Sequence, residues 1–438
     1  MKVIFISLPV KDNSPAGEEI LPPEPYLLSG LTRQNRHHSE VCHIQQSGDH
    51  FLTDDADLKP VRDAQAICII TDTVKWPRYR TLLSHIRQLN PQCTIIAGGL
   101  HPTLFSEQML RKTPVDVVIR GEMENSLTLL LEHLKNKKGK IQEIPGISMI
   151  LENRIHHSPD PPALSDRQLE QLPFPLLEDL PQDICQGLSL ETSRGMPFHR
   201  PLFPLLHPRQ WRFISPVGIY QRLYHIREQY LSRTKDRFIH IVDPYFSAKF
   251  KRIRDFHNIC KKKNETFSLD YHVFCSDLLN DSFLDCAGSF TRRIIFTPVS
   301  GSPQMLNRHV KGLCPEVIRD CVKTVQKHRF NHRVQFCFYL GLPGETPRDA
   351  GMTLNMAEYV QDLLGSGVRV GWWYPRPGTV YWNDLEKMQI RMPDPIDEID
   401  TSCLMKLGAL LCPRLNRQEQ EKLQDRLRNS GLSWTASP

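Results

Sequence analysis

The chain has 438 residues, of which 40% are hydrophobic and 24% are charged, and its formal net charge is +6. This length suits two or three domains with separate cores, and the composition is that of a globular protein. No apolar run approaches the roughly 18 residues that a membrane span needs. The apolar stretch at 3–8 stops at Pro9, which is too short for a signal peptide and predicts a buried first strand. We therefore expect a cytoplasmic protein without a membrane span.

Two basic clusters, at 135–140 and 249–263, contribute to the positive charge. Such clusters occur on nucleic-acid-binding surfaces. Here, however, no aromatic residues alternate with the cations as they do in single-strand binders, and lysine is favoured at helix C-termini. We interpret both clusters as solvated helix ends and expect no nucleic-acid partner. The twelve cysteines show no CxxC or CxxxCxxC spacing, which indicates separate thiols rather than a disulfide framework.

Residues 1–137 alternate short apolar strands with amphipathic helical stretches. Strands are predicted at 3–8, 41–44, 66–71, 94–97 and 115–119, and helices at 79–89 and 124–134. This alternation predicts a parallel, doubly wound, Rossmann-like sheet, whose ligands bind at the carboxyl ends of the strands. The turns Gly98–Thr103 and Arg120–Glu124 fall at that edge.

We interpret residues 138–185 as a linker. It contains a small predicted hairpin at 144–155, followed by six prolines between 158 and 181, which disfavour helices and sheet ladders. The alternation resumes over 186–385. Strands are predicted at 187–191, 238–242, 267–273, 293–297, 334–340 and 368–373, with helices at 217–231 and 349–364 among them. Six such units predict a partial TIM-like (β/α)6 barrel. Residues 386–438 form a small C-terminal segment with helices predicted at 401–411 and 417–428, which we expect to pack against the barrel or cover its mouth.

The two turns of the first domain carry a resemblance to a known family. The stretches IIAGGLHPT and DVVIRGEMEN resemble the GGxHxT and RGExE motifs of the cobalamin-binding domain that precedes many radical S-adenosylmethionine (SAM) enzymes. The resemblance implies cobalamin as a cofactor, beside Gly98, Gly99, His101, Thr103, Gly121, Glu122 and Glu124. The DxHxxG motif that supplies a histidine to cobalt elsewhere is incomplete at Asp255 and Asp270, so no protein histidine below cobalt is implied.

The second domain resembles the radical SAM barrel through motifs that occur in the same order. These are Glu191–Gly195, Ser215–Pro216, Asp243, Ser300–Ser302, Gly341–Thr346 and Pro375–Thr379. With the first domain, the resemblance covers about residues 1–385. It implies a SAM pocket, retained or vestigial, at Arg194, Ser300, Gly341, Gly344 and Glu345.

The chain departs from this family at the catalytic centre. The family's three CxxxCxxC cysteines align with Met196, Arg200 and Phe203, none of which is a thiolate. Because thiolates hold iron–sulfur clusters, we expect neither a 4Fe–4S cluster nor another metal at these positions, and no 5′-deoxyadenosyl radical. In addition, Val299 stands where the family often has a glutamate in Glu-Ser-Gly-Ser, so a polar partner of SAM is lost.

Other residues near the loop do not restore a cluster. Cys185 supplies one thiol where three are needed, and His199 and His207 lie eight residues apart in a loop. The loop is instead rich in apolar side chains and in proline, at 196, 197, 198, 201, 202, 203, 204 and 208. Because an unfilled cavity is destabilising, we predict that these side chains fill the space a cluster would leave.

Three functions remain open from the sequence. The first is a non-radical cobalamin-dependent enzyme, for example a methyltransferase, with SAM as one candidate methyl donor. The second is a non-catalytic cobalamin-binding protein or the partner of an intact relative, and the third is a radical enzyme with a rearranged cluster. The surviving motifs favour retained cobalamin and an unidentified small-molecule or peptide substrate. No catalytic base is singled out among Asp243, Glu191, His101 and His240, all near strand ends.

Overall fold

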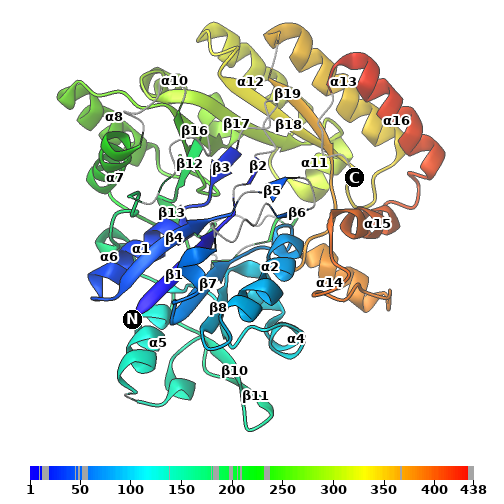
Figure 1. The fold of residues 1–438 in the computed structure, drawn as a ribbon. Helices are drawn as coiled ribbons and strands as arrows, with labels where there is room; N and C mark the ends of the chain where they lie inside the picture. Colours follow the sequence, from blue (N-terminus) through cyan, green and yellow to red (C-terminus); the bar gives the residue numbers. More distant parts are fainter. Residues whose placement is uncertain are drawn as a thin grey trace.

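The computed structural model describes residues 1–8, 10–11, 19–44, 46–47, 50–51, 58–137, 139–178, 180, 187–196, 201–204, 206–207, 210–230, 237–365 and 367–432. In them, two mainly parallel sheets carry helices on their faces (Figure 1). The predicted α/β fold class is confirmed. The predictions at Pro9, Cys185, Phe198, His199 and Arg200 lie outside the described residues.

The first sheet contains the five predicted parallel strands in the order β4-β1-β7-β8-β9. They are β1 (Lys2–Ser7), β4 (His38–His43), β7 (Ala66–Ile70), β8 (Thr94–Gly98) and β9 (Val117–Ile119). The helices are α1 (Glu24–Gln34), α2 (Trp76–Leu89), α3 (Leu100–Leu104), α4 (Ser106–Lys112) and α5 (Glu124–Asn136), with a 3-10 turn η1 (Lys59–Val61). The turns after β8 and β9 therefore lie at the carboxyl edge, as predicted.

The predicted hairpin extends this first sheet. Its strands β10 (Ile147–Leu151) and β11 (Arg154–His157) are joined by Glu152 and Asn153, both with positive φ (47° and 61°), as a tight two-residue hairpin turn requires. β10 pairs antiparallel with β9. The connection to the second sheet then passes through α6 (Asp166–Gln171), and a 3-10 turn η2 (Ile141–Glu143) precedes the hairpin.

The second sheet has the order β19-β18-β17-β16-β15-β12-β3-β2. Six of its strands were predicted, namely β12 (Gly187–Leu190), β15 (Phe238–Ile241), β16 (Leu269–Val273), β17 (Thr291–Val299), β18 (Val334–Leu340) and β19 (Val368–Trp372). The other two, β3 (Glu19–Leu21) and β2 (Val10–Lys11), come from the N-terminal region and were missed, because strands this short show no periodicity. Two small antiparallel pairs, β13 (Ser193–Arg194) with β14 (Arg212–Phe213) and β5 (Gln46–Ser47) with β6 (His50–Phe51), complete the strands.

Helices follow most strands of this second sheet. They are α7 (Pro216–Gln229), α8 (Phe250–Lys263), α9 (Cys275–Leu278), α10 (Asp281–Ala287), α11 (Pro303–His309), α12 (Pro315–Lys327), α13 (Pro347–Leu364) and α14 (Val380–Lys387). Ser215 caps α7 by accepting a hydrogen bond from Gly218 N, and Thr346 caps α13 in a capping box with Asp349. Three lysines, 261–263, end α8, which agrees with the interpretation of that cluster as a helix end.

The C-terminal helices contact both domains. α16 (Arg417–Ser430) packs on α13, where Arg426 Nε donates to Glu358 Oε1 at 2.9 Å. α15 (Thr401–Leu411) places Leu404 and Leu407 in the same apolar core as Trp76 of α2. Trp76 Nε1 also donates to the carbonyl of Ile396 at 3.0 Å. The segment thus packs on the barrel, as expected, and on the first domain as well. Within the described residues, no helix has the length and apolar character required to cross a membrane.

Candidate functional site

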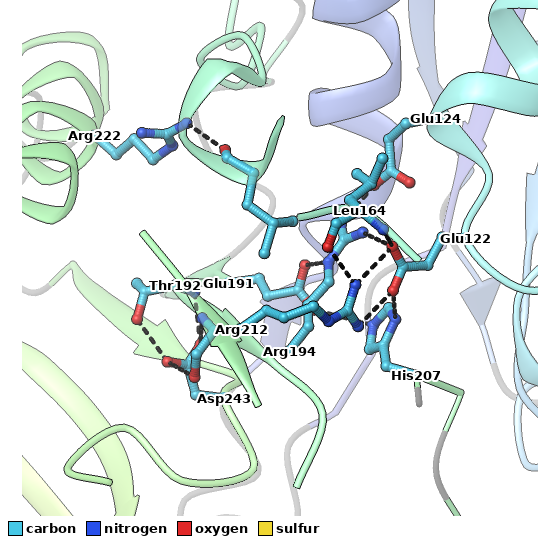
Figure 2. Close-up of polar contacts among 12 residues, drawn as sticks. Glu122, Glu124, Leu164, Glu191, Thr192, Arg194, His207, Arg212, Arg222 and Asp243 are labelled. Carbon is cyan, nitrogen blue, oxygen red and sulfur yellow. Dashed lines mark hydrogen bonds and ion pairs between the residues drawn. The ribbon is translucent and has the colours of Figure 1, made fainter. Parts of the chain in front are cut away.

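A buried cluster of charged side chains joins the carboxyl edges of the two sheets. Arg194, only 4% exposed, lies between carboxylates from both domains (Figure 2). Its Nη2 donates to Glu124 Oε1 at 2.5 Å and its Nε to Glu191 Oε2 at 2.7 Å, while Nη1 lies 3.4 Å from Glu122 Oε2. The Glu191–Gly195 motif, which follows β12, therefore contacts the Arg120–Glu124 motif, which follows β9.

Two further cations from the barrel side complete this group. Arg212 Nη2 donates to Glu122 Oε1 at 2.7 Å, and its Nη1 donates to the carbonyl of Leu164 at 2.7 Å. His207 lies between two carboxylates, with Nδ1 3.0 Å from Glu122 Oε1 and Nε2 3.2 Å from Glu191 Oε1. We call these six residues (Glu122, Glu124, Glu191, Arg194, His207 and Arg212) the interdomain charge cluster.

The charges of the cluster stabilise one another despite burial. Burial opposes ionisation of Glu122, but hydrogen bonds from His207 and Arg212 hold its pKa well below the usual range. Burial likewise opposes ionisation of Glu191, and the charge of Arg194 lowers its pKa to about 2. For His207, burial disfavours the charged form, yet hydrogen bonds to Glu122 and Glu191 raise the pKa to about 9. At neutral pH Glu122 and Glu191 are therefore carboxylates, and His207 is protonated.

Asp243 holds the β13 end of the cluster in place. This fully buried carboxylate accepts hydrogen bonds from the backbone and hydroxyl groups of Thr192 (2.6 and 2.5 Å) and Ser193 (2.9 and 2.7 Å). Arg252 donates in turn to the Thr192 carbonyl at 2.7 Å. The Asp243 side chain after the second barrel strand therefore positions the Glu191–Arg194 turn.

The glycine turn after β8 is packed by protein groups. A Cβ on Gly98 would lie 2.1 Å from the sulfur of Met123, and a Cβ on Gly99 (φ +96°) would lie 2.5 Å from the Thr71 carbonyl oxygen. Thr103 Oγ1 donates to Gly99 O at 2.7 Å and accepts from Gly121 N at 3.0 Å, so it ties the two predicted turns together.

His101 is fully buried in the first domain. Its ring stacks on Trp76 at 5.1 Å and contacts Phe105 at 5.0 Å, and Nδ1 lies 3.3 Å from Thr73 Oγ1. Burial lowers its pKa to about 3, so the ring is neutral. The predicted cobalamin residues are thus brought together at one edge, and the carboxylates of Glu122 and Glu124 face barrel cations. Their role toward cobalamin stays a prediction.

The predicted SAM residues also have protein partners. Ser300 is fully buried with its hydroxyl 2.8 Å from Thr353 Oγ1. Glu345, fully buried, accepts from Gly341 N at 2.6 Å, and burial raises its pKa to about 8. A Cβ on Gly344 would lie 1.8 Å from Arg308 Nη1. Binding of SAM at these positions stays a prediction.

Two of the aligned cluster-cysteine positions, Met196 and Phe203, lie in the described part of the chain. Met196 is 4% exposed, and Phe203 lies 6.1 Å from the ring of Tyr339. Leu202, 2% exposed, belongs to a small apolar group with Val299, Met305, Leu342 and Trp373. Trp373 Nε1 donates to the Leu202 carbonyl at 3.3 Å. The loop therefore fills part of the barrel mouth.

Beside that loop, a cavity of about 620 Å³ remains at the barrel mouth. Its wall is formed by the loop, the segments at the carboxyl ends of β15, β16 and β17, the C-terminal end of α11 with the residues that follow it, and the start of α14. The apolar lining includes Leu202, Phe203, Phe274, Phe296, Val299, Val310, Leu313 and Val380. The filling predicted from the sequence is therefore incomplete, and the remaining space has the size of a small-molecule site.

Polar side chains are confined to a few points of this wall. Tyr381 Oη lies 2.9 Å from His309 Nδ1, and His309 Nε2 lies 3.3 Å from the Pro343 carbonyl. A carbonyl only accepts, so Nε2 carries the proton and Nδ1 accepts from Tyr381. Burial lowers the pKa of His309 to about 4. Tyr245 Oη donates to Asp277 Oδ1 at 3.5 Å behind the wall.

Sequence reasoning missed Arg212, Tyr245, His309 and Tyr381. None stands in a motif, and each gains its place through contacts with residues far along the chain, such as Arg212 with Glu122. A partial signal was available for Arg212, because a lone arginine in the short apolar strand Arg212–Phe213 requires a buried anion.

The fold matches solved structures over almost the whole chain. The cobalamin-dependent S-adenosylmethionine radical enzyme OxsB with aqua-cobalamin bound superposes with a TM-score of 0.74 and 19% identity, covering 98% of this chain and 71% of OxsB. The radical S-adenosylmethionine methyltransferase TsrM from Kitasatospora setae, with cobalamin and a 4Fe–4S cluster bound, gives a TM-score of 0.66 and 13% identity, covering 88% of this chain and 75% of TsrM.

Sequence comparisons add nothing to this match. No protein-family model matches the chain, and no match was found among curated protein sequences. The structural likeness shows that the chain has the fold of cobalamin-dependent radical SAM enzymes, with the Rossmann-like domain and partial barrel predicted from its motifs.

Proposed function

We propose that this protein binds cobalamin, carries no 4Fe–4S cluster and acts in non-radical chemistry, with methyl transfer as the reaction class. The observation that carries the proposal is the barrel mouth, where Met196 is buried, Phe203 packs near Tyr339 and the intervening Leu202 joins an apolar group. Thioether, phenyl and alkyl groups do not replace the thiolates that hold a cluster. Without a cluster, SAM is not cleaved reductively.

The carboxyl edge of the first sheet fits cobalamin in one respect. The turn of Gly98 and Gly99 lies at that edge next to the turn of Gly121, and Thr103 ties the two turns together. These backbone segments would hold the group, while Glu122 and Glu124 would support it from behind by fixing the two domains together. The match to cobalamin-bound OxsB over 98% of the chain supports this arrangement.

Cobalamin, when bound, supplies a methyl group that a nucleophile can accept without a radical. The residues of this chain would bind and orient the acceptor in the barrel-mouth cavity and keep water away with its apolar wall. The neutral His309 has both ring nitrogens engaged, by Tyr381 and by the Pro343 carbonyl, so it fixes this part of the wall rather than serving as a base. We retain the expectation of a cytoplasmic protein.

The test is reconstitution of the full chain with hydroxocobalamin and, separately, with iron and sulfide. We expect a corrin spectrum that survives desalting and no retained iron. About four retained iron atoms per chain would refute the proposal and favour a rearranged cluster. Retained cobalamin whose methyl form never loses its methyl group to any acceptor would favour the non-catalytic alternative.

A matched variant sharpens the iron test. Replacing Met196, Arg200 and Phe203 together by cysteine restores the family spacing. We expect this variant to retain iron while the parent chain does not. Iron binding by both, or by neither, would show that these three positions do not decide whether a cluster forms.

A further inference from the structure

The barrel-mouth cavity combines an apolar wall with two cations and no described anion. Arg308 and Lys311 line it, both exposed at the C-terminal end of α11 and just beyond. None of the described residues that line it is acidic. Behind the wall, the Asp277 carboxylate accepts hydrogen bonds from Ser247 Oγ at 2.6 Å and from Phe274 N at 2.9 Å. The cavity therefore complements a negative charge.

The position of Arg308 is built into the fold. Its Nη1 donates to the Pro343 carbonyl at 3.1 Å and occupies the place where a side chain at residue 344 would begin. Gly344 (φ +78°) leaves this space open. The guanidinium is thus held at the rim, and a guanidinium matches the two oxygens of a carboxylate.

The floor of the cavity carries backbone strain. Val299 has φ +78°, a conformation that is unfavourable for a β-branched residue, and its side chain is 2% exposed. The pairing of β17 with β18 shifts register between Phe296 and Val299. Strain of this kind persists at sites where a ligand or reaction uses the geometry. Here it places an apolar side chain where the family often has a glutamate.

We propose that the barrel-mouth cavity binds an amphipathic organic acid, with its apolar body against Phe203, Phe274 and Val299 and its carboxylate at Arg308 and Lys311. This proposal names the substrate class for the proposed function. It rests on that function in one respect, because the proposed function leaves the barrel mouth without a 4Fe–4S cluster. SAM fits this cavity poorly, because its sulfonium would face two cations and no carboxylate.

The test uses the full chain and isothermal titration calorimetry. The probes are phenylacetate, indole-3-acetate and octanoate, each beside its neutral amide, and SAM. For ligands of this size we expect a dissociation constant of about 0.1–1 mM for at least one acid, and binding of its amide weaker by about fivefold. Equal binding of acid and amide, no binding of any acid, or tighter binding of SAM than of the acids would overturn the proposal.

Variants locate the binding site. Arg308→Gln should weaken the acid by about fivefold and leave the amide unchanged, since the exposed cation contributes a modest, charge-specific attraction. Lys323→Gln is the matched control, because this exposed lysine on α12 removes the same charge away from the cavity. Ser276→Trp, at an exposed position of the wall, should abolish binding of both acid and amide. An acid that binds Ser276→Trp as well as the parent chain would overturn the assignment.

Iron and melting temperature are measured in the same samples. Retained iron together with acid binding would defeat the proposed function but leave the cavity assignment standing. No iron and no acid binding would defeat only the cavity assignment. A variant with an unchanged melting temperature excludes misfolding as the cause of lost binding.

Discussion

Replacing Arg194 by methionine should destabilise the whole molecule. Methionine keeps much of the side-chain volume but removes the positive charge that contacts the carboxylates of Glu124, Glu191 and Glu122. Glu122 and Glu191 would keep His207, whereas the Glu124 carboxylate, which is 5% exposed, would lose the Arg194 guanidinium that donates to it at 2.5 Å. Removing one member of a buried ion pair costs about 3–5 kcal/mol, and we expect a loss of that order.

The assay is urea unfolding followed by circular dichroism, with a second variant to identify the cause. Arg194→Met with Glu124→Gln removes the uncompensated carboxylate as well, so part of the lost stability should return. Arg417→Met is the matched control, since Arg417 pairs with Glu421 while its side chain is 92% exposed, and no measurable change is expected. An Arg194→Met protein within about 1 kcal/mol of the parent chain, or a double variant less stable than the single one, would refute this reasoning.

Three further outcomes are expected. Because the pKa of Glu191 is lowered to about 2, its contribution to stability should be lost as pH falls from about 4.5 towards 2. Because the pKa of His207 is raised to about 9, its contribution should be lost as pH rises from about 6.5 through 9. Melting temperatures measured across pH will check both effects. The pKa of Glu345 is raised to about 8, so its contribution to stability is lost as pH rises from about 4.5 through 8. Glu345→Gln should therefore flatten the dependence of melting temperature on pH over that range, and an unchanged slope would contradict this prediction. Gly98→Ala should lower the melting temperature because its Cβ would meet the Met123 sulfur, and Gly98→Ala combined with Met123→Ala should recover part of the loss.

The sequence predicted the strands that are apolar and long enough to show a pattern. All five parallel strands of the first sheet and six of the second were found this way, since buried parallel strands read as apolar runs. The short strands Val10–Lys11 and Glu19–Leu21 were missed, although Glu19–Leu21 pairs with β12 and carries the N-terminal region into the second sheet. Their pairing depends on how the domains lie together, which local patterns do not encode.

The same limit applies to the candidate site. Motifs located Glu122, Glu124 and Arg194, and the sequence predicts that the Arg120–Glu124 turn faces the Leu190–Pro204 loop across the domain interface. The spacing does not show which side chains pair, and Arg194 contacts both glutamates, which lie 70 or more positions earlier. The cavity was hidden for a similar reason, because its wall combines a loop, three strand ends and two helices. The sequence did indicate that an apolar loop replaces the cysteines, and Leu202 is packed accordingly.

These contacts explain how the fold can persist when its cluster ligands are absent. The interdomain charge cluster joins the two domains, and Asp243 positions its Glu191–Arg194 turn, so these contacts are made by protein groups alone. These contacts involve none of the three positions that align with the family's cysteines. Leu202 and Val299 then line the remaining space with apolar surface, and Arg308 places a cation at its rim. On the proposal above, this lining suits a ligand with an apolar body and one negative charge.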